Sequence, residues 1–428
     1  MTADRQSPIK GRWRPSPSHI VWIGLLAPAL TVGISTSVGP HVAIFVVMAA
    51  LLCANDRATW QALMLGAGAT ALLLCHTIVT ESLDTCRDLM LKSVASQVLL
   101  VVALAALCLL ALAGRSRPSQ RSMAWLVALL VAAVVVEKIY LVATGAKETI
   151  RPSGFFSEPS HFALAIAPLL IHLILDENPR WRRAGIVGAV LSLWLAASAT
   201  LFLLLAVGLG VMWLALHGRR LRFWKAAQVV VMSVVFAGVA YVSPFWSDFM
   251  DRITSLGNQS TEANVSSVVY VMGWELAIEN LSNSRGLGLG FNRMGCEPRP
   301  STEGVEVLDL LGLDDGNYND GSFLASKALS EMGYFAAVLW LWLAWRAWRF
   351  RHLLHELPGP EAEQARLMMS LLLCGLVGLL LRGTGYFTGP VLLAAYGYFW
   401  LREVGSQQAG RTPVPTMLAP NRDLSPRG

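Results

Sequence analysis

Apolar residues in this chain gather into long runs that contain no charge and do not alternate with polar residues. Val94–Gly114 and Ala184–Leu216 are two such runs. About 20 consecutive apolar residues span a bilayer as a helix, and a helix satisfies its own backbone hydrogen bonds in lipid. Strands of a membrane β-barrel would instead alternate between apolar and polar positions. The pattern therefore predicts an all-α, multi-pass membrane protein.

The same pattern predicts about twelve membrane-spanning helices, some short enough to tilt or to thin the bilayer. Their expected ranges are 19–39, 40–54, 60–80, 94–113, 123–145, 161–175, 184–197, 199–216, 226–243, 331–348, 367–381 and 390–402. This transmembrane domain, 19–405, follows a cytoplasmic N-terminal tail, 1–18, and precedes a cytoplasmic tail, 406–428, that we expect to be disordered. We expect outer loops over about 146–160 and 244–330.

Composition and charge support the membrane class and set the orientation. The chain is 54% hydrophobic but 14% charged, whereas soluble domains carry about a quarter charged residues. With both termini in the cytoplasm, every basic cluster falls on the cytoplasmic side, as the positive-inside rule requires. These clusters are Arg115, Arg117 and Arg121; Arg180, Arg182 and Arg183; Arg219, Arg220, Arg222 and Lys225; and Arg346, Arg349, Arg351 and Arg366.

Two consequences follow from this orientation. Ala184–Leu216 must contain two spans, 184–197 and 199–216, because a single span would invert every downstream cluster. The net charge of +6 is explained by basic cytoplasmic loops, so it does not indicate a nucleic-acid partner. The polar, basic start and the missing small-residue cleavage site also predict no cleavable signal peptide.

The loop before the sixth predicted span holds the most informative motif, Arg151-Pro-Ser-Gly-Phe-Phe-Ser-Glu-Pro-Ser-His-Phe-Ala163. Its prolines and glycine interrupt regular helix, and the proline after Glu158 suits the first position of a new helix. A cation, a carboxylate and an imidazole, from Arg151, Glu158 and His161, would then lie at the membrane edge beside Ser157. The simpler alternative is a helix N-cap with interfacial anchors.

The large outer loop contains a second candidate, Arg285-Gly-Leu-Gly-Leu-Gly-Phe-Asn292-Arg293. Its glycines permit close backbone approach to a ligand, and its arginines suit phosphate oxygens. A Gly-rich turn with solvated arginines is the alternative. The glycine spacing does not match a dinucleotide fingerprint.

The end of that loop and the eleventh span supply two further candidates. Asp320 lies in an acidic stretch that lacks the twelfth-position acid of an EF-hand, so we predict no metal site there. Glu331 is interpreted as an acid in the first turn of the tenth span. Arg382, at the outer end of the eleventh span, is either functional or a snorkelling anchor. Cys86 and Cys296 both fall in predicted outer loops, where a disulfide is permitted, but their separation stays open.

These residues resemble a known family. The motif from Arg151 to Ala163 resembles the outer-loop motif of Wzy-type polysaccharide polymerases, within the O-antigen polymerase and ligase superfamily. The Gly-Leu-Gly-Phe run after Arg285 resembles that family's second substrate loop, and Gly321-Ser…Glu331-Met-Gly-Tyr also fits. The resemblance implies a C-type glycosyltransferase architecture in the bacterial inner membrane, with the site facing the periplasm.

The resemblance further implies the reaction and its partners. The donor is a glycan on undecaprenyl diphosphate, the acceptor is another lipid-linked repeat unit, and transfer inverts the anomeric centre without nucleotide sugar, cofactor or metal. A chain-length regulator is a further candidate partner. We predict a catalytic set of Glu158, Arg151, Arg285 and His161. We predict a substrate-binding set of Arg293, Asn292, Asp320, Arg382 and Ser157.

Chemistry supports that division of roles. Preorganised arginines stabilise the charge that grows on a departing diphosphate. The acceptor hydroxyl needs a base, for which Glu158 is preferred over His161 and Asp320.

Two alternatives stay open. An O-antigen ligase is one, although the large loop contains no His, which the ligases commonly carry there. A secondary transporter is the other, although the predicted span centres are almost free of charge.

The alternation of basic loops gives a testable topology. We expect Gln120 in the cytoplasm and Ser301 in the periplasm. Single cysteines introduced there, in a variant lacking the six native cysteines, should react with a membrane-impermeant maleimide in whole cells at position 301 and not at position 120. Outside labelling of position 120 would refute the map.

Overall fold

The computed structural model describes helices and their connections in thirteen stretches of the chain. The described residues are 16–26, 45–49, 56–81, 89–113, 119–145, 151–217, 238, 250–251, 254, 264–295, 302–313, 321–382 and 385–410. All regular elements described in these stretches are helical, which confirms the all-α prediction for this part of the chain. The expected spans 19–39, 40–54 and 226–243 lie largely outside it, as do Cys86, Cys296 and Asp320.

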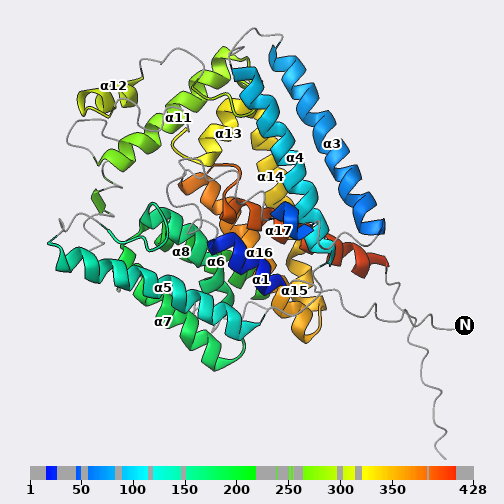
Figure 1. Cartoon of the computed structure of the whole chain (residues 1–428), viewed down its shortest axis with the longest axis vertical. Helices are drawn as coiled ribbons and strands as arrows, with labels where there is room; N and C mark the ends of the chain where they lie inside the picture. Colours follow the sequence, from blue (N-terminus) through cyan, green and yellow to red (C-terminus); the bar gives the residue numbers. More distant parts are fainter. Residues whose placement is uncertain are drawn as a thin grey trace, which may run out of the picture.

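Figure 1 shows the arrangement of the helices, several of which coincide with expected spans. In chain order they are α1 (Pro17–Leu26), α3 (Asp56–Glu81), α4 (Met90–Ala113), α5 (Gln120–Ala143), α6 (Pro159–Ile174), α7 (Pro179–Ala196), α8 (Ala199–His217), α11 (Val265–Asn283), α12 (Glu303–Leu310), α13 (Leu324–Met332), α14 (Tyr334–Arg349), the 3₁₀ turn η3 (Phe350–His352), α15 (Leu353–Glu356), α16 (Gly359–Leu381) and α17 (Gly389–Gly410). The helix α17 continues past the expected start of the tail at residue 406.

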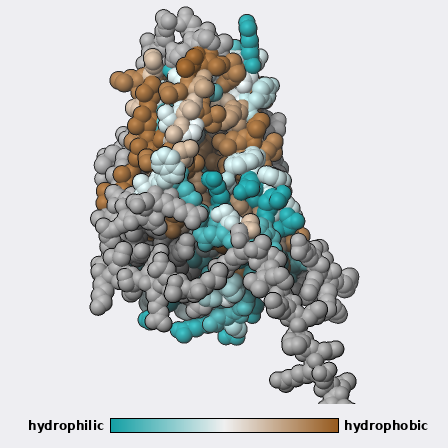
Figure 2. All heavy atoms as spheres, turned by 90° about the vertical axis from the view of Figure 1, so that its right-hand side faces the viewer, coloured by the Kyte–Doolittle hydropathy of each residue, from teal (hydrophilic) through white to brown (hydrophobic). Residues whose placement is uncertain are grey.

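Exposed apolar faces identify this as a membrane protein. Among the described residues, five helices are long and apolar enough to cross a bilayer: α3, α4, α5, α8 and α16. Trp60 on α3 and Val136 on α5 are each 65% exposed, and Val338 on α14 is 63% exposed. Figure 2 shows apolar residues gathered over the upper part of the face on which α3 lies. Such faces are unfavourable in water and favourable in lipid. Twelve spans remain a prediction.

The centre of the bundle is α6. Its residues from Phe162 to Leu173 are all buried, because α7, α8 and α16 pack around it. The helix α17 packs in turn against α16, α4 and α1. A helix buried on every side is apolar all round, which explains why its sequence has no polar stripe.

The predicted break within Ala184–Leu216 is present as two helices, of which α8 is among the five helices able to cross a bilayer. The helix α7 ends at Ala196 and α8 begins at Ala199. Between them, Ala197 adopts the left-handed conformation with φ of 44°, a strained choice for a residue with a Cβ atom. The chain therefore reverses direction inside a continuous apolar run, where no glycine or proline signals a turn.

Long-range polar contacts lie at the two ends of the helices. One end, which we call the basic end, carries Arg180, Arg349, Arg351 and Arg366. Its contacts join Ser119 to Ser18, His172 to Gln120, Arg366 to Glu177 and His355 to Ala215. The opposite end, which we call the loop end, is where α3, α5 and α16 finish and where α4, α6 and α17 begin. Helices that alternate in direction produce this separation, because polar pairs avoid the hydrocarbon.

Much of the expected outer loop 244–330 is itself helical. The segment Val265–Asn283 forms α11, which packs with α12 and α13 around a small core of its own. The rings of Tyr270 and Trp274 lie 4.6 and 5.0 Å from that of Phe323.

Close packing of α16 on α17 gives a stability prediction. Gly397→Ala should destabilise the protein by about 1–3 kcal/mol, because the added Cβ would lie 2.6 Å from the carbonyl oxygen of Met368. Gly210→Ala in α8 is the matched control, because nothing lies within 4 Å of its added Cβ. The better helix propensity of alanine should leave that variant at least as stable as the parent. Thermal unfolding in detergent compares the two, and equal midpoints would contradict this packing.

Candidate functional site

An ion pair between Glu158 and Arg382 is the centre of the candidate site. Glu158 ends the loop before α6, and Arg382 is the first residue after α16. The Nε and Nη2 atoms of Arg382 donate to Oε2 of Glu158 at 3.2 and 2.5 Å. Ser160 donates to the same oxygen at 2.9 Å. The contact joins residues 224 positions apart and leaves the Glu158 side chain 43% exposed.

The structure separates two roles that the sequence left open for Glu158. Its backbone starts α6, as predicted, with Pro159 at the first turn, but its side chain does not cap the helix. The carboxylate is instead committed to Arg382. Burial alone would raise the pKa of Glu158, but the charge and hydrogen bonds of Arg382, the Ser160 hydroxyl and the nearby His161 lower it overall. A lowered pKa makes Glu158 a weaker base than we expected.

Contacts with neighbouring helices hold the remainder of the motif in place. The Nδ1 atom of His161 lies 2.8 Å from the Ser157 hydroxyl. Arg151 donates from Nη1 to the carbonyl oxygen of Ala197 at 3.1 Å, at the reversal between α7 and α8. The carboxylate of Glu137, on α5, accepts from the backbone N–H groups of residues 153 and 154 at 2.6 and 2.5 Å. Three helices therefore fix the loop that carries the motif.

The glycine run after Arg285 has a structural role that differs from the one predicted. A Cβ on Gly288 would lie 2.5 Å from the carbonyl oxygen of Glu331, and one on Gly333 would lie 2.1 Å from that of Gly286. Backbone hydrogen bonds of 2.9 Å join Leu289 and Gly290 to the end of α13. The glycines thus allow this loop to pack closely against the turn between α13 and α14. That turn, rather than the expected ligand, contacts the glycines.

Glu331 organises the second half of the site. It is fully buried and lies in the last turn of α13, so the interpretation as a first-turn acid was wrong. Its oxygens accept from the backbone N–H groups of Asn292 and Met294 at 2.8 and 3.1 Å, and from the Tyr386 hydroxyl at 2.7 Å. The Nζ atom of Lys327 lies 3.9 Å away. One carboxylate thereby fixes the conformation of the segment around Arg293.

The segment between α16 and α17 links the two halves. It carries Arg382 to Glu158 and, four residues later, Tyr386 to Glu331. Burial, followed by the charge of Glu331 and its hydrogen bond, raises the pKa of Tyr386 well above its ordinary value, so the phenol stays a neutral donor. Tyr270 of α11 donates to the carbonyl oxygen of residue 380 at 3.1 Å. Both halves therefore lie at the loop end.

The predicted site residues divide by exposure. Glu158, Arg382, Ser157, His161 and Arg151 form the ion-pair half, and each is at least partly exposed. Arg285 is exposed in the left-handed turn that ends α11, and none of the contacts described here joins it to Glu158. Arg293 is completely buried, which contradicts the solvated-turn alternative for this residue. Asn292 is held by Glu331 and by Ser96 of α4, at 2.7 Å from the latter.

Sequence reasoning missed Glu137 and Tyr386 and misread Glu331. Glu137 is a lone carboxylate within a predicted span, and carboxylates at such positions are usually paired or functional. That signal was present in the sequence. Tyr386 carried no signal, because its role depends on a residue 55 positions away.

The ion pair yields a double-mutant prediction. Glu158→Gln and Arg382→Gln should each destabilise the protein, and the pair should show a coupling of about 1 kcal/mol, because both side chains retain solvent access. A depressed carboxyl pKa contributes stability above its ordinary value of 4.5, and this is lost as the pH falls through the lowered pKa. Unfolding in mixed micelles at neutral pH and below about pH 4 measures both effects. Coupling that is unchanged in acid would contradict the ion pair.

What this site does must be argued from its own residues. No protein-family model matches the chain, and no curated protein matches it. The loop end offers the Glu158–Arg382 pair with His161 next to it, Arg151 at the α7–α8 reversal, and the Glu331 network.

Proposed function

We propose that this protein is a polysaccharide polymerase of the bacterial inner membrane. It would join undecaprenyl-diphosphate-linked oligosaccharide repeat units at the periplasmic face. The single observation that carries the proposal is the Glu158–Arg382 ion pair, with His161 next to it and Arg151 of the same loop held at the reversal between α7 and α8. A carboxylate, an imidazole and two guanidinium groups are thus gathered where membrane helices begin and end. The resemblance of the loop motif supplies the substrate class.

The reaction needs cations on one side of the reacting carbon. The bond between the anomeric carbon and the diphosphate oxygen breaks while the acceptor oxygen attacks, and negative charge grows on the diphosphate. Arginine stabilises this charge through its forked donors. Arg382 and Arg151 supply these donors, and Arg285 is an exposed cation on the neighbouring loop. A diphosphate would compete with Glu158 for Arg382, which would couple substrate binding to release of the carboxylate.

The reaction also needs a group that takes the acceptor proton. Glu158 was the first choice, but its lowered pKa weakens it as a base while it is paired with Arg382. Release from Arg382 on diphosphate binding would restore its basicity. His161 is the second group within reach, since its charge acts on Glu158 and its ring is oriented by Ser157. We therefore assign proton transfer to this carboxylate–imidazole pair.

Complementation of a deletion strain tests the proposal. Cells lacking the protein should accumulate single lipid-linked repeat units and lose long polymer. Glu158→Gln should reduce polymer formation by about 10²–10⁴, because glutamine keeps the side-chain size but cannot take a proton. Arg382→Lys and Arg151→Lys should also impair polymer, because lysine loses the forked donors. Polymer is read on a gel, with membrane protein levels measured in parallel.

Matched controls separate chemistry from folding. Arg182→Ala removes an exposed arginine from the basic end and should leave polymer length normal. Normal polymer in each of the three single variants Glu158→Gln, His161→Gln and Arg382→Ala would refute the proposal. Polymer of normal length that stays on its lipid carrier would favour the ligase alternative, and unpolymerised units confined to the cytoplasmic leaflet would favour a transporter.

A further inference from the structure

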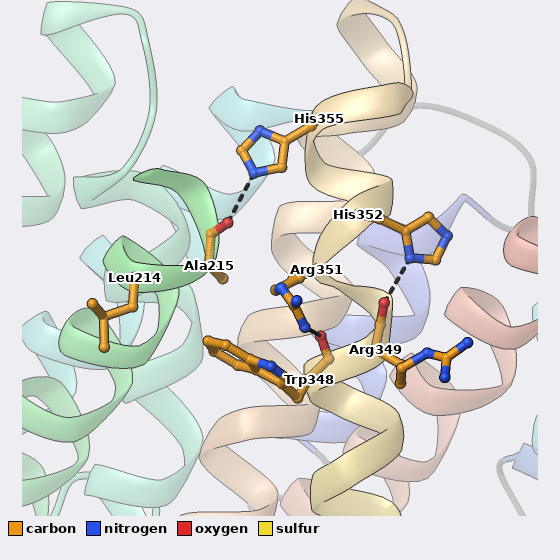
Figure 3. A pocket seen from close by; sticks show the side chains of 7 residues that line it. All are labelled: Leu214, Ala215, Trp348, Arg349, Arg351, His352 and His355. Atoms are coloured by element: carbon orange, nitrogen blue, oxygen red, sulfur yellow. Dashed lines mark hydrogen bonds between the residues drawn. The ribbon is translucent and has the colours of Figure 1, made fainter. Parts of the chain in front are cut away.

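A basic pocket lies at the end of the bundle opposite the candidate site. It has a volume of about 290 Å³ and is bordered by the end of α8 and by the turns that follow α14 (Figure 3). Its lining side chains are Leu214, Ala215, Trp348, Arg349, Arg351, His352 and His355. Two arginines and two histidines thus face one cavity that no described carboxylate lines. Its chemistry suits an anion.

The fold holds these cations in place without neutralising them. The Nε2 atom of His355 lies 2.9 Å from the carbonyl oxygen of Ala215, which ties α15 to α8. Arg351 donates to the carbonyl oxygen of Trp348 at 3.0 Å, and its guanidinium lies 4.4 Å from the Trp348 ring centre. These contacts orient the His355 imidazole and the Arg351 guanidinium, and none of them involves an acidic side chain. Guanidinium groups held in this way suit phosphate oxygens.

An almost wholly apolar pocket adjoins the basic one. It has a volume of about 200 Å³, lies between α8, α14 and α16, and shares Ala215, Trp348 and Arg351 with the basic pocket. It reaches Trp340, two helical turns before Trp348, which corresponds to about 12 Å along α14. A basic pocket continuous with an apolar groove has the form of a phosphate-headed lipid. A free phosphate ion would leave the apolar groove unfilled.

A second pocket at the basic end repeats the pairing of arginine with tryptophan. It is lined by Arg121, Trp125, Arg180 and Trp181, and the Arg180 guanidinium lies 5.3 Å from the Trp181 ring centre. Tryptophan and arginine are typical of the zone where acyl chains meet headgroups. This places the first pocket at the depth of a phospholipid headgroup.

We propose that the pocket between α8 and the α14–α15 turns binds an anionic phospholipid, with the phosphate at Arg349 and Arg351 and an acyl chain in the groove along α14. The histidines at 352 and 355 add donors to the headgroup. A lipid bound here would contact α8, α14 and α16 together. The helices α8 and α16 pack against the central helix α6, and α14 packs against α16. The proposal is independent of the polymerase assignment, because it uses none of the residues at the loop end.

Native mass spectrometry of the full-length protein tests the proposal. The probes are short-chain phosphatidylglycerol, short-chain phosphatidylcholine and inorganic phosphate. The parent protein should bind phosphatidylglycerol about tenfold more tightly than phosphatidylcholine, because basic residues favour a lipid with a net negative charge. The double variant Arg349→Ala with Arg351→Ala should lose this preference. Arg182→Ala with Arg183→Ala, which removes two exposed arginines from the same end, should keep it.

Two further variants make the test decisive. Arg349→Lys with Arg351→Lys keeps the charge and should retain part of the preference, which would tie the preference to positive charge at these two positions. Ala344→Phe fills the groove without altering charge and should weaken phosphatidylglycerol binding while leaving inorganic phosphate binding unchanged. A preference that survives both alanine substitutions would overturn the proposal. Undiminished lipid binding by Ala344→Phe would overturn the lipid in favour of a simple anion site.

Discussion

Hydrocarbon offers no partner for a backbone N–H or C=O group, and this constraint accounts for most of the structure. In lipid the chain must satisfy its hydrogen bonds within each helix, so long apolar runs become helices. Polar side chains then collect where the helices end, as the contacts of Glu158 at the loop end and of Arg366 at the basic end illustrate. The candidate site at the loop end and the pocket at the basic end are consequences of that separation.

The loop end shows how charged groups are accommodated near a membrane. Glu331 is removed from solvent, and its carboxylate is surrounded by donors from Asn292, Met294 and Tyr386. A buried charge without such partners would cost several kcal/mol, and removal of one partner is strongly destabilising. Glu158, in contrast, keeps solvent access and one strong partner in Arg382. The first arrangement suits a structural anchor, and the second suits a group that a substrate can engage.

The basic end shows the complementary arrangement. Its arginines stack on Trp348 and Trp181 and leave their charges without an acidic partner among the lining residues. Cations held on aromatic rings are oriented at little cost in desolvation. In the orientation predicted from the sequence, the arginines expected to face the cytoplasm include those that we propose bind an anionic headgroup. Orientation in the membrane and lipid binding would then depend on one set of side chains.

The sequence by itself determined the long apolar helices from α3 to α8, the break within Ala184–Leu216 and the start of α6 at Glu158, because each follows from hydropathy, charge or proline geometry over a few neighbouring residues. Only the tertiary structure decided that Glu158 pairs with Arg382 and that Arg293 is buried. It also decided that Glu331 accepts hydrogen bonds from the segment that follows the glycine run. These contacts join positions tens to hundreds of residues apart. Their pairing depends on how helix ends are stacked side by side, which no local pattern of apolar and polar residues encodes.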